Sequence, residues 1–276
     1  MTLTDIEIGV LGGGSMGQEI ISFLTNRKIK NANLVSIFDK DQNRLDNLSK
    51  ILPANIFITN SIDKFLSVGK IRLVVESASA EAVKQYGSLI LNSNKNLVVM
   101  SSGVFNDINF LNSLENIAEK KSLQLLIPSG AVGGIDSIKA IKDQIKKISI
   151  TTTKSPKSLM GALGFKEYEN VVFKKEQIIF KGNSQQAIKL FPANVNVSTT
   201  LSLVGIGPQK TDVTIICDPN INENKHEICV EGAFGQLNFS MNLHPSKKNP
   251  KTSSLAIFSV IEKIRTFCNP HISIGT

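Results

Sequence analysis

The chain has 276 residues, of which 41% are hydrophobic, 20% charged and 6% aromatic. This apolar content is typical of a globular protein and excludes an intrinsically disordered chain. Lys and Arg number 31 against 23 acids, for a net charge of +8, but the lysines are scattered and Trp is absent, so the composition does not favour a nucleic-acid partner.

The sequence also argues against a membrane protein and a metal site. No apolar run approaches the roughly 20 residues that span a bilayer, and residues 1–7 hold acids without the basic segment of a secretory signal. Three cysteines without metal-ligand spacing fit a reducing compartment, and no two histidines pair with carboxylates at metal-ligand spacing. We therefore expect a cytoplasmic protein with no membrane partner and no metal.

The first forty residues have the pattern of a dinucleotide-binding unit. A buried strand is predicted over residues 6–11, a glycine-rich turn over 12–17, a helix over 18–25 and a second strand over 34–38. The second strand ends at Asp39. Strand, glycine turn, helix, strand and acid together form the context that the dinucleotide fingerprint requires.

The glycine-rich turn predicts contacts with a cofactor phosphate. Gly12 allows a tight turn, Gly14 leaves room for a pyrophosphate, and Gly17 lets the helix lie close to the strand. The N-terminus of the helix offers unpaired N–H groups to the phosphates. We expect five residues of the turn to bind the cofactor: Gly12, Gly14, Ser15, Met16 and Gly17.

The acid that follows the second strand predicts the type of cofactor. Asp39 is placed to accept hydrogen bonds from the adenine ribose, and its charge would repel a 2′-phosphate, which favours NAD. Lys40 and Arg44 lie nearby in the sequence and could soften that preference, so NADP stays possible.

Further along the chain, the alternation of strands and helices continues and then changes. Apolar strands over 71–76, 96–100 and 123–127 predict a doubly wound parallel sheet of the Rossmann type. After about residue 145 the pattern indicates a second α/β domain with a mixed or antiparallel sheet. Its predicted elements are strands over 147–153, 213–217, 227–230 and 237–241, a helix near 196–204 and a closing helix over 252–267.

Few residues of the second half are candidates for acid–base chemistry. His226 lies in a polar stretch, predicted as a loop leading into a strand, where it could act as an acid or base or simply face solvent. His244 is expected to be structural or exposed, and His271 is expected at the surface. The polar stretch 191–200 holds Asn side chains that could bind a carboxamide or cap a helix.

Several motifs in the same order resemble those of the L-aspartate dehydrogenase family. They lie at residues 9–17, 129–136, 191–197, 218–219 together with 226–228, and 249–253. The first is shared by many dehydrogenases, whereas the other four together are specific, and the resemblance spans nearly the whole chain.

The resemblance implies a Rossmann domain over residues 1–128, completed by 251–276, joined to a catalytic domain over 129–250, with the C-terminal helix returning to the first domain. It also implies the reversible NAD(P)-dependent oxidation of L-aspartate to iminoaspartate, which water converts to oxaloacetate and ammonia. Iminoaspartate could feed NAD biosynthesis. A dimer or tetramer of identical chains is expected for this class.

The family's functional residues map onto a few positions. The catalytic histidine maps onto His226, and two nicotinamide contacts map onto Ala131 and Asn196, with Asn194 the alternative to Asn196. A dicarboxylate substrate also needs cationic or N–H-rich groups. Residues at the start of the closing helix could supply them: Lys251, Thr252 and Ser253.

Two other classes of protein share the first half of this pattern. One is another small-molecule dehydrogenase, of the homoserine or dihydrodipicolinate reductase type. The other is a regulator that binds a dinucleotide without turnover.

Overall fold

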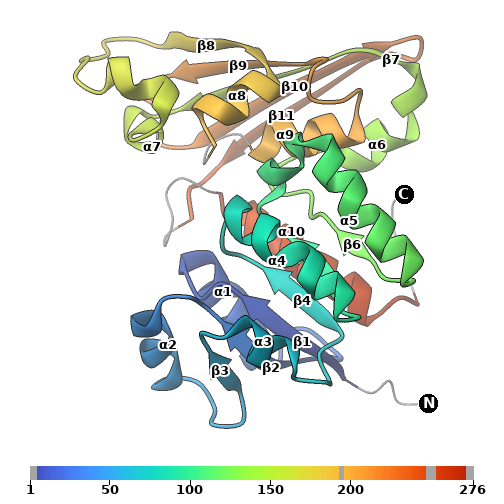
Figure 1. Cartoon of the computed structure of the whole chain (residues 1–276). Helices are drawn as coiled ribbons and strands as arrows, with labels where there is room; N and C mark the ends of the chain where they lie inside the picture. The colour runs from blue at the N-terminus through green and yellow to red at the C-terminus, as the bar shows by residue number, and fades with distance from the viewer. Residues whose placement is uncertain (1–4, 193–195, 247–252, 272–276) are drawn as a thin grey trace. The chain divides into compact units, whose positions relative to one another are not determined.

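The computed structural model describes residues 5–192, 196–246 and 253–271, which form two compact units (Figure 1). The chain passes from the first unit to the second between Pro128 and Ser129, and returns to the first between Ala256 and Ile257.

The first unit contains a six-stranded parallel sheet in the order β3-β2-β1-β4-β5-β6. The reversal of strand order beside β1 is the arrangement of a doubly wound sheet, so the predicted Rossmann-type fold is confirmed. The strands are β1 (Ile6–Leu11), β2 (Ala32–Phe38), β3 (Phe57–Thr59), β4 (Leu73–Glu76), β5 (Asn96–Val99) and β6 (Leu125–Leu126).

Helices of the first unit bury their apolar faces on this sheet. Ile20 and Leu24 of α1, for example, share one core with Ile8 and Val10 of β1. The helices are α1 (Ser15–Thr25), α2 (Gln42–Ser49), α3 (Ile62–Leu66), α4 (Ala80–Asn92), the 3₁₀ helix η1 (Ser102–Asn106) and α5 (Ile108–Lys120).

The C-terminal helix α10 (Ser254–Cys268) returns to the first unit, as the resemblance implies. Four apolar side chains at helical spacing, Ile257, Val260, Ile261 and Ile264, are buried in the same core as β1. Just after the helix, Asn269 donates a hydrogen bond to the Lys30 carbonyl at 3.0 Å.

The second unit contains a five-stranded mixed sheet in the order β11-β10-β7-β9-β8, in which only β7 and β9 are parallel neighbours. Its strands are β7 (Ile145–Lys154), β8 (Gln177–Asn183), β9 (Thr211–Cys217), β10 (Asn224–Gly232) and β11 (Gly235–Leu243). The predicted mixed sheet and the helix near 196–204 are confirmed.

Helices cover one face of this sheet, which we call the covered face. Ala187 of α8 and Leu201 of α9 share a core with Ile148, Val213 and Ile228 of the sheet. The helices are α6 (Ile135–Ala140), η2 (Lys142–Gln144), α7 (Pro156–Leu159), η3 (Leu163–Tyr168), α8 (Ser184–Leu190) and α9 (Asn196–Val204).

The edge strand β8 is absent from the sequence-based prediction. Ile178 is 56% exposed in it, and Lys181 and Gly182 follow. Because one side of an edge strand lacks a neighbour, its residues need not be apolar on either face, and the alternating signal is lost.

Candidate active site

The glycine-rich turn of the first unit joins β1 to α1, and close packing explains two of its glycines. Gly12 has φ +107°, and a Cβ there would lie 2.9 Å from the backbone nitrogen of Ala78. A Cβ on Gly17 would overlap the carbonyl oxygen of Gly12. These glycines let the first turn of α1 pack against the end of β4.

Gly14 differs because nothing in the fold requires it to lack a side chain. Its φ of −68° suits any residue, and the nearest atom to a Cβ there would be Arg44 Nη1 at 3.8 Å. Gly14 is the N-cap of α1, with exposed Ser15 and half-buried Met16 following. The open approach to these first-turn N–H groups fits a phosphate group of a cofactor.

Asp39, the acid after β2, is tied to this turn. Its Oδ2 accepts a hydrogen bond from Gly13 N–H at 2.7 Å, and its Oδ1 accepts one from Asp41 N–H at 2.9 Å. Arg44 Nη1 lies 3.4 Å from Oδ2. A carboxylate has about four acceptor sites, so the fixed oxygens retain capacity for ribose hydroxyl groups, while Arg44 places a cation beside them.

A second carboxylate, unforeseen from the sequence, lies where β4 ends. Glu76 is 1% exposed, and its Oε1 accepts hydrogen bonds from Ala78 N–H and Ser101 Oγ, each at 2.8 Å. Its Oε2 accepts a hydrogen bond from Ser101 N–H at 3.0 Å. Burial raises the pKa of Glu76, and these hydrogen bonds oppose that shift. Glu76 therefore links the loops that follow β4 and β5. The sequence feature that could have identified it is an acidic residue at the end of an apolar strand.

In the second unit, His226 lies inside β10, which corrects the prediction of a loop. It pairs with Thr152 of β7 on one side and with Met241 of β11 on the other. It is 2% exposed, and its Nδ1 is 3.0 Å from Thr152 Oγ1. Burial lowers the pKa of His226 to about 3, with a further contribution from the charge of Lys154. The imidazole is therefore neutral, with one ring nitrogen held by Thr152.

The neighbours of His226 on β7 and β10 are polar, although they lie on the covered face. Along β7 this face carries Ile148 and Ile150 and then Thr152 and Lys154, because side chains alternate between faces. Residues of β10 follow the reverse order, from Val230 and Ile228 to His226 and Asn224. We call the last four residues, Thr152, Lys154, Asn224 and His226, the polar end of the covered face.

The structure describes the positions of three other residues predicted for the site. Asn196 is exposed and is the first residue of α9, and Ala131 is buried in the turn after β6. Ser253 is buried and forms a bridge with Pro245, and no partner for its hydroxyl is found in the described part of the chain.

Three further positions considered from the sequence lie outside the described residues: Asn194, Lys251 and Thr252. Exposure of His244 and His271 at the surface is confirmed.

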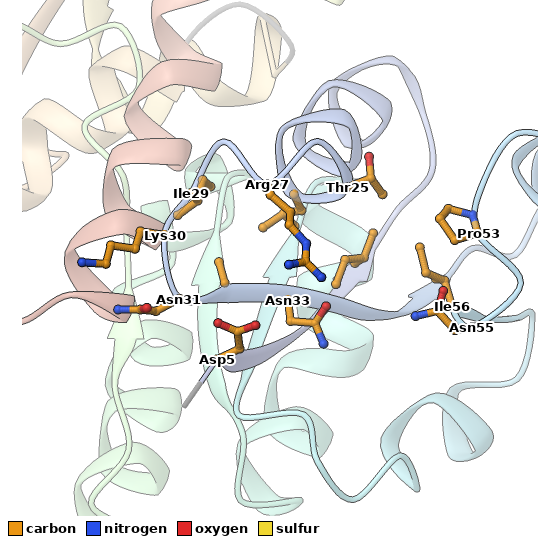
Figure 2. A pocket seen from close by; sticks show the side chains of 13 residues that line it. Asp5, Thr25, Arg27, Ile29, Lys30, Asn31, Asn33, Pro53, Asn55 and Ile56 are labelled. Atoms are coloured by element: carbon orange, nitrogen blue, oxygen red, sulfur yellow. The ribbon is translucent and has the colours of Figure 1, made fainter. Parts of the chain in front are cut away.

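A pocket of about 370 Å³ lies elsewhere in the first unit (Figure 2). Its lining includes Asp5, Arg27 and Asn33, around the beginning of β2. The glycine turn follows the opposite end of the neighbouring parallel strand β1. The pocket therefore includes none of the residues predicted for the site.

Within the described ranges, no group of three or more His, Cys, Asp or Glu side chains could hold a metal ion. The same part of the chain contains no helix with the length and apolar character needed to cross a membrane.

Comparison with known proteins links both units to dehydrogenases. Residues 136–267 match a family model described as aspartate dehydrogenase, C-terminal, and residues 12–128 match one described as homoserine dehydrogenase, NAD binding domain. Over 271 residues the chain is 38% identical to an L-aspartate dehydrogenase from Nitrosopumilus maritimus, covering 98% of this chain and 99% of the relative.

Two further aspartate dehydrogenases are similar to this chain over nearly its whole length. An L-aspartate dehydrogenase from Methanosarcina barkeri is 37% identical over 277 residues, covering 98% of this chain and 100% of the relative. The crystal structure of an aspartate dehydrogenase from Thermotoga maritima superposes with a TM-score of 0.76 at 27% identity, covering 98% of this chain and 99% of that one.

Proposed function

Because the chain belongs to the L-aspartate dehydrogenase family, we propose that it oxidises L-aspartate with NAD to iminoaspartate, which water then converts to oxaloacetate and ammonia. The observation that carries the proposal is the match over 98% of the chain. That match includes the second unit, in which a buried neutral histidine lies among other polar side chains.

The first unit has the groups that would hold the cofactor. The N–H groups at Gly14 fit the pyrophosphate, and the fixed carboxylate of Asp39 fits the adenine ribose. When bound, the nicotinamide ring supplies the acceptor for the hydride that leaves the substrate Cα. Arg44, beside Asp39, supports some use of NADP because its charge can offset repulsion of a 2′-phosphate.

His226 supplies the proton transfers in this proposal. Oxidation of the substrate amine requires its neutral form, and hydrolysis of the product imine requires a water molecule to lose a proton. The hydrogen bond of Nδ1 with Thr152 leaves Nε2 for the substrate. Because the substrate brings two carboxylates, its negative charge would raise the pKa of His226 and make the ring a better base than in the free protein.

The overall reaction balances as L-aspartate, NAD⁺ and water giving oxaloacetate, ammonium, NADH and one proton. We further propose that it runs in both directions and that iminoaspartate can feed the synthesis of pyridine nucleotides. The protein would work in the cytoplasm, in keeping with three free cysteines, and as an assembly of identical subunits.

The test is the rise in absorbance at about 340 nm when L-aspartate and NAD are added to the protein. The proposal expects turnover with L-aspartate and much less with D-aspartate, L-asparagine or L-homoserine, and NADP is run beside NAD. Turnover of L-homoserine alone would instead indicate a homoserine-type dehydrogenase. Binding of NADH without turnover of any of these substrates would indicate a dinucleotide-binding regulator.

A further inference from the structure

We infer that Lys154 and Asn224 form a carboxylate-binding subsite beside His226, which receives one carboxylate group of the dicarboxylate substrate. The inference rests on the proposed function, because it assigns groups that hold the substrate while His226 acts on it. It concerns side chains of β7 and β10, rather than the segment 251–253 that the sequence favoured for this role.

The pairing of the two strands places Lys154 and Asn224 together. Lys225 pairs with Thr153, so the next row of this antiparallel ladder brings Asn224 opposite Lys154. His226 and Thr152 form the adjacent row on the same face. The proposed subsite is thus the next row after the histidine on the same face, at the end of β7 and the beginning of β10, where the apolar side chains of these two strands stop.

Asn224 provides the first sign that this row binds an acceptor. Its side chain is 2% exposed, and within the described residues its Nδ2 has no hydrogen-bond partner. A buried donor without an acceptor is unfavourable, and a carboxylate oxygen of a ligand would satisfy it. Amide groups in such positions fix the orientation of polar ligands in binding sites.

Lys154 adds a positive charge to the same row. It is 3% exposed at the end of β7, and burial lowers the pKa of its ammonium to about 8. The same charge contributes to the lowered pKa of His226, which lies on the neighbouring row of the same face. A carboxylate bound at Lys154 would offset this charge and stabilise both the ammonium and a protonated His226.

The alternative is that Lys154 itself moves a proton during the reaction. The two roles differ in their kinetics: a carboxylate receptor holds the substrate in both its ground and transition states, so its loss raises KM more than it lowers kcat. A proton-transferring lysine would act on kcat and on the dependence of kcat on pH.

The experiment compares Lys154→Met and Asn224→Leu with matched controls. Lys147→Met removes an exposed lysine of β7, and Asn242→Leu removes an exposed asparagine of β11. Each protein is assayed for KM and kcat with L-aspartate, for the Kd of NADH, and for binding of succinate, a dicarboxylate without an amine, in the presence of NADH.

We expect each site variant to raise the KM for L-aspartate about 10- to 100-fold, the range for losing a hydrogen bond to a charged group. The Kd of NADH should stay within about twofold of wild type, since a change of that size is under 0.5 kcal/mol. Succinate binding should weaken in parallel with KM, and Lys154→Arg, which keeps the charge, should recover part of the affinity. Both controls should behave as wild type.

An unchanged KM in folded variants would overturn the inference, and so would a loss confined to kcat with an altered pH profile. Circular dichroism and thermal unfolding establish that the variants fold. If Lys154→Met or Asn224→Leu does not fold, Asn224→Asp tests the same point, because a carboxylate there would repel the substrate.

The succinate measurement separates this inference from the proposed function. If the wild-type protein binds succinate through Lys154 but does not oxidise L-aspartate, the subsite is supported and the proposed function is refuted. If the wild-type protein oxidises L-aspartate and the Lys154 and Asn224 variants have an unchanged KM, the proposed function is supported and the subsite is refuted.

Discussion

His226 depends on its neighbours in the sheet for its chemical state. The ring is enclosed within β10, hydrogen-bonded to Thr152 and close to the charge of Lys154. The imidazole is therefore neutral near pH 7, and in the proposed reaction the negative charge of the substrate would raise its pKa.

The buried neutral imidazole should make stability depend on pH. Folding lowers the pKa of His226 from 6.5 to about 3, so between these values the unfolded chain binds more protons and stability falls as the pH falls. Between about pH 7 and about pH 4.5 this one group accounts for a loss of roughly 2 kcal/mol.

The variant His226→Gln should therefore lose roughly 2 kcal/mol less than wild type over that pH range. Urea unfolding followed by circular dichroism at the two pH values measures the difference. The control His271→Gln changes an exposed histidine and should match wild type. Equal losses in wild type and His226→Gln would contradict a buried neutral imidazole.

Asp39 should set the preference between the two dinucleotides. The variant Asp39→Ser removes both the ribose acceptor and the charge that repels a 2′-phosphate, while Arg44 remains. The ratio of NADPH to NADH affinity should rise by roughly tenfold or more, as measured by equilibrium binding.

The matched control for this variant is Asp41→Ser. Asp41 also contacts Arg44, at 3.3 Å, but its side chain caps α2 rather than binding the glycine turn. It should keep the wild-type ratio. An unchanged ratio in Asp39→Ser would remove Asp39 from cofactor recognition.

At the scale of the elements, the turn between β1 and α1 contains glycines that differ in whether packing requires them. Gly17 is required by the fold because a side chain would meet the Gly12 carbonyl, whereas a Cβ on Gly14 would have only Arg44 Nη1 within 4 Å, at 3.8 Å. Both positions belong to the same fingerprint, and the structure shows that packing requires Gly17 but does not require Gly14.

The variants Gly14→Ala and Gly17→Ala should accordingly fail in different ways. Gly14→Ala should keep the wild-type thermal midpoint but weaken NADH binding roughly tenfold or more, because a methyl group stands where the pyrophosphate approaches. Gly17→Ala should lose about 1–3 kcal/mol of stability. Calorimetry and an NADH titration on each protein give both quantities, and wild-type NADH affinity in Gly14→Ala would contradict the phosphate site.

Some elements could be predicted from the sequence because their signals are local. The strand, turn and helix over residues 6–25 follow from apolar spacing and glycines within one short segment. By contrast, β10 begins at Asn224, whereas the alternation of apolar residues that indicates a strand begins only at Ile228. The sequence therefore predicts His226 in a loop. The polar start of the strand is held by pairing with Thr152 and Thr153, over 70 residues earlier.

The candidate site shows the same limit. Gly14, Asp39 and His226 could be selected from motifs, but Lys154 and Asn224 belong to no motif and come together only through the ladder between β7 and β10. Glu76 likewise gains a role only when the ends of β4 and β5 lie side by side.

At the scale of the whole molecule, the chain leaves the first unit after Pro128 and returns to it at Ile257. The core of the cofactor-binding unit is therefore complete only when α10 has been added, and Ile261 is buried in it.

The variant Ile261→Ala should consequently destabilise the unit that binds the dinucleotide, although it lies far from the glycine turn in the sequence. A buried Ile→Ala change costs about 2–5 kcal/mol, which should lower the thermal midpoint by roughly 5–15 °C. The neighbouring Glu262→Ala removes an exposed side chain that forms an ion pair with Arg265 and should have little effect. An unchanged midpoint in Ile261→Ala would contradict the packing of α10 on this core.

The most direct test of the central claim is the oxidation of NADH by oxaloacetate and ammonium, followed at about 340 nm in wild type and in His226→Ala. We expect wild-type turnover that requires both oxaloacetate and ammonium, and a loss of about 100-fold or more in the variant, with NADH binding retained. Turnover that does not need ammonium, or full activity in His226→Ala, would contradict an aspartate dehydrogenase that acts through this histidine.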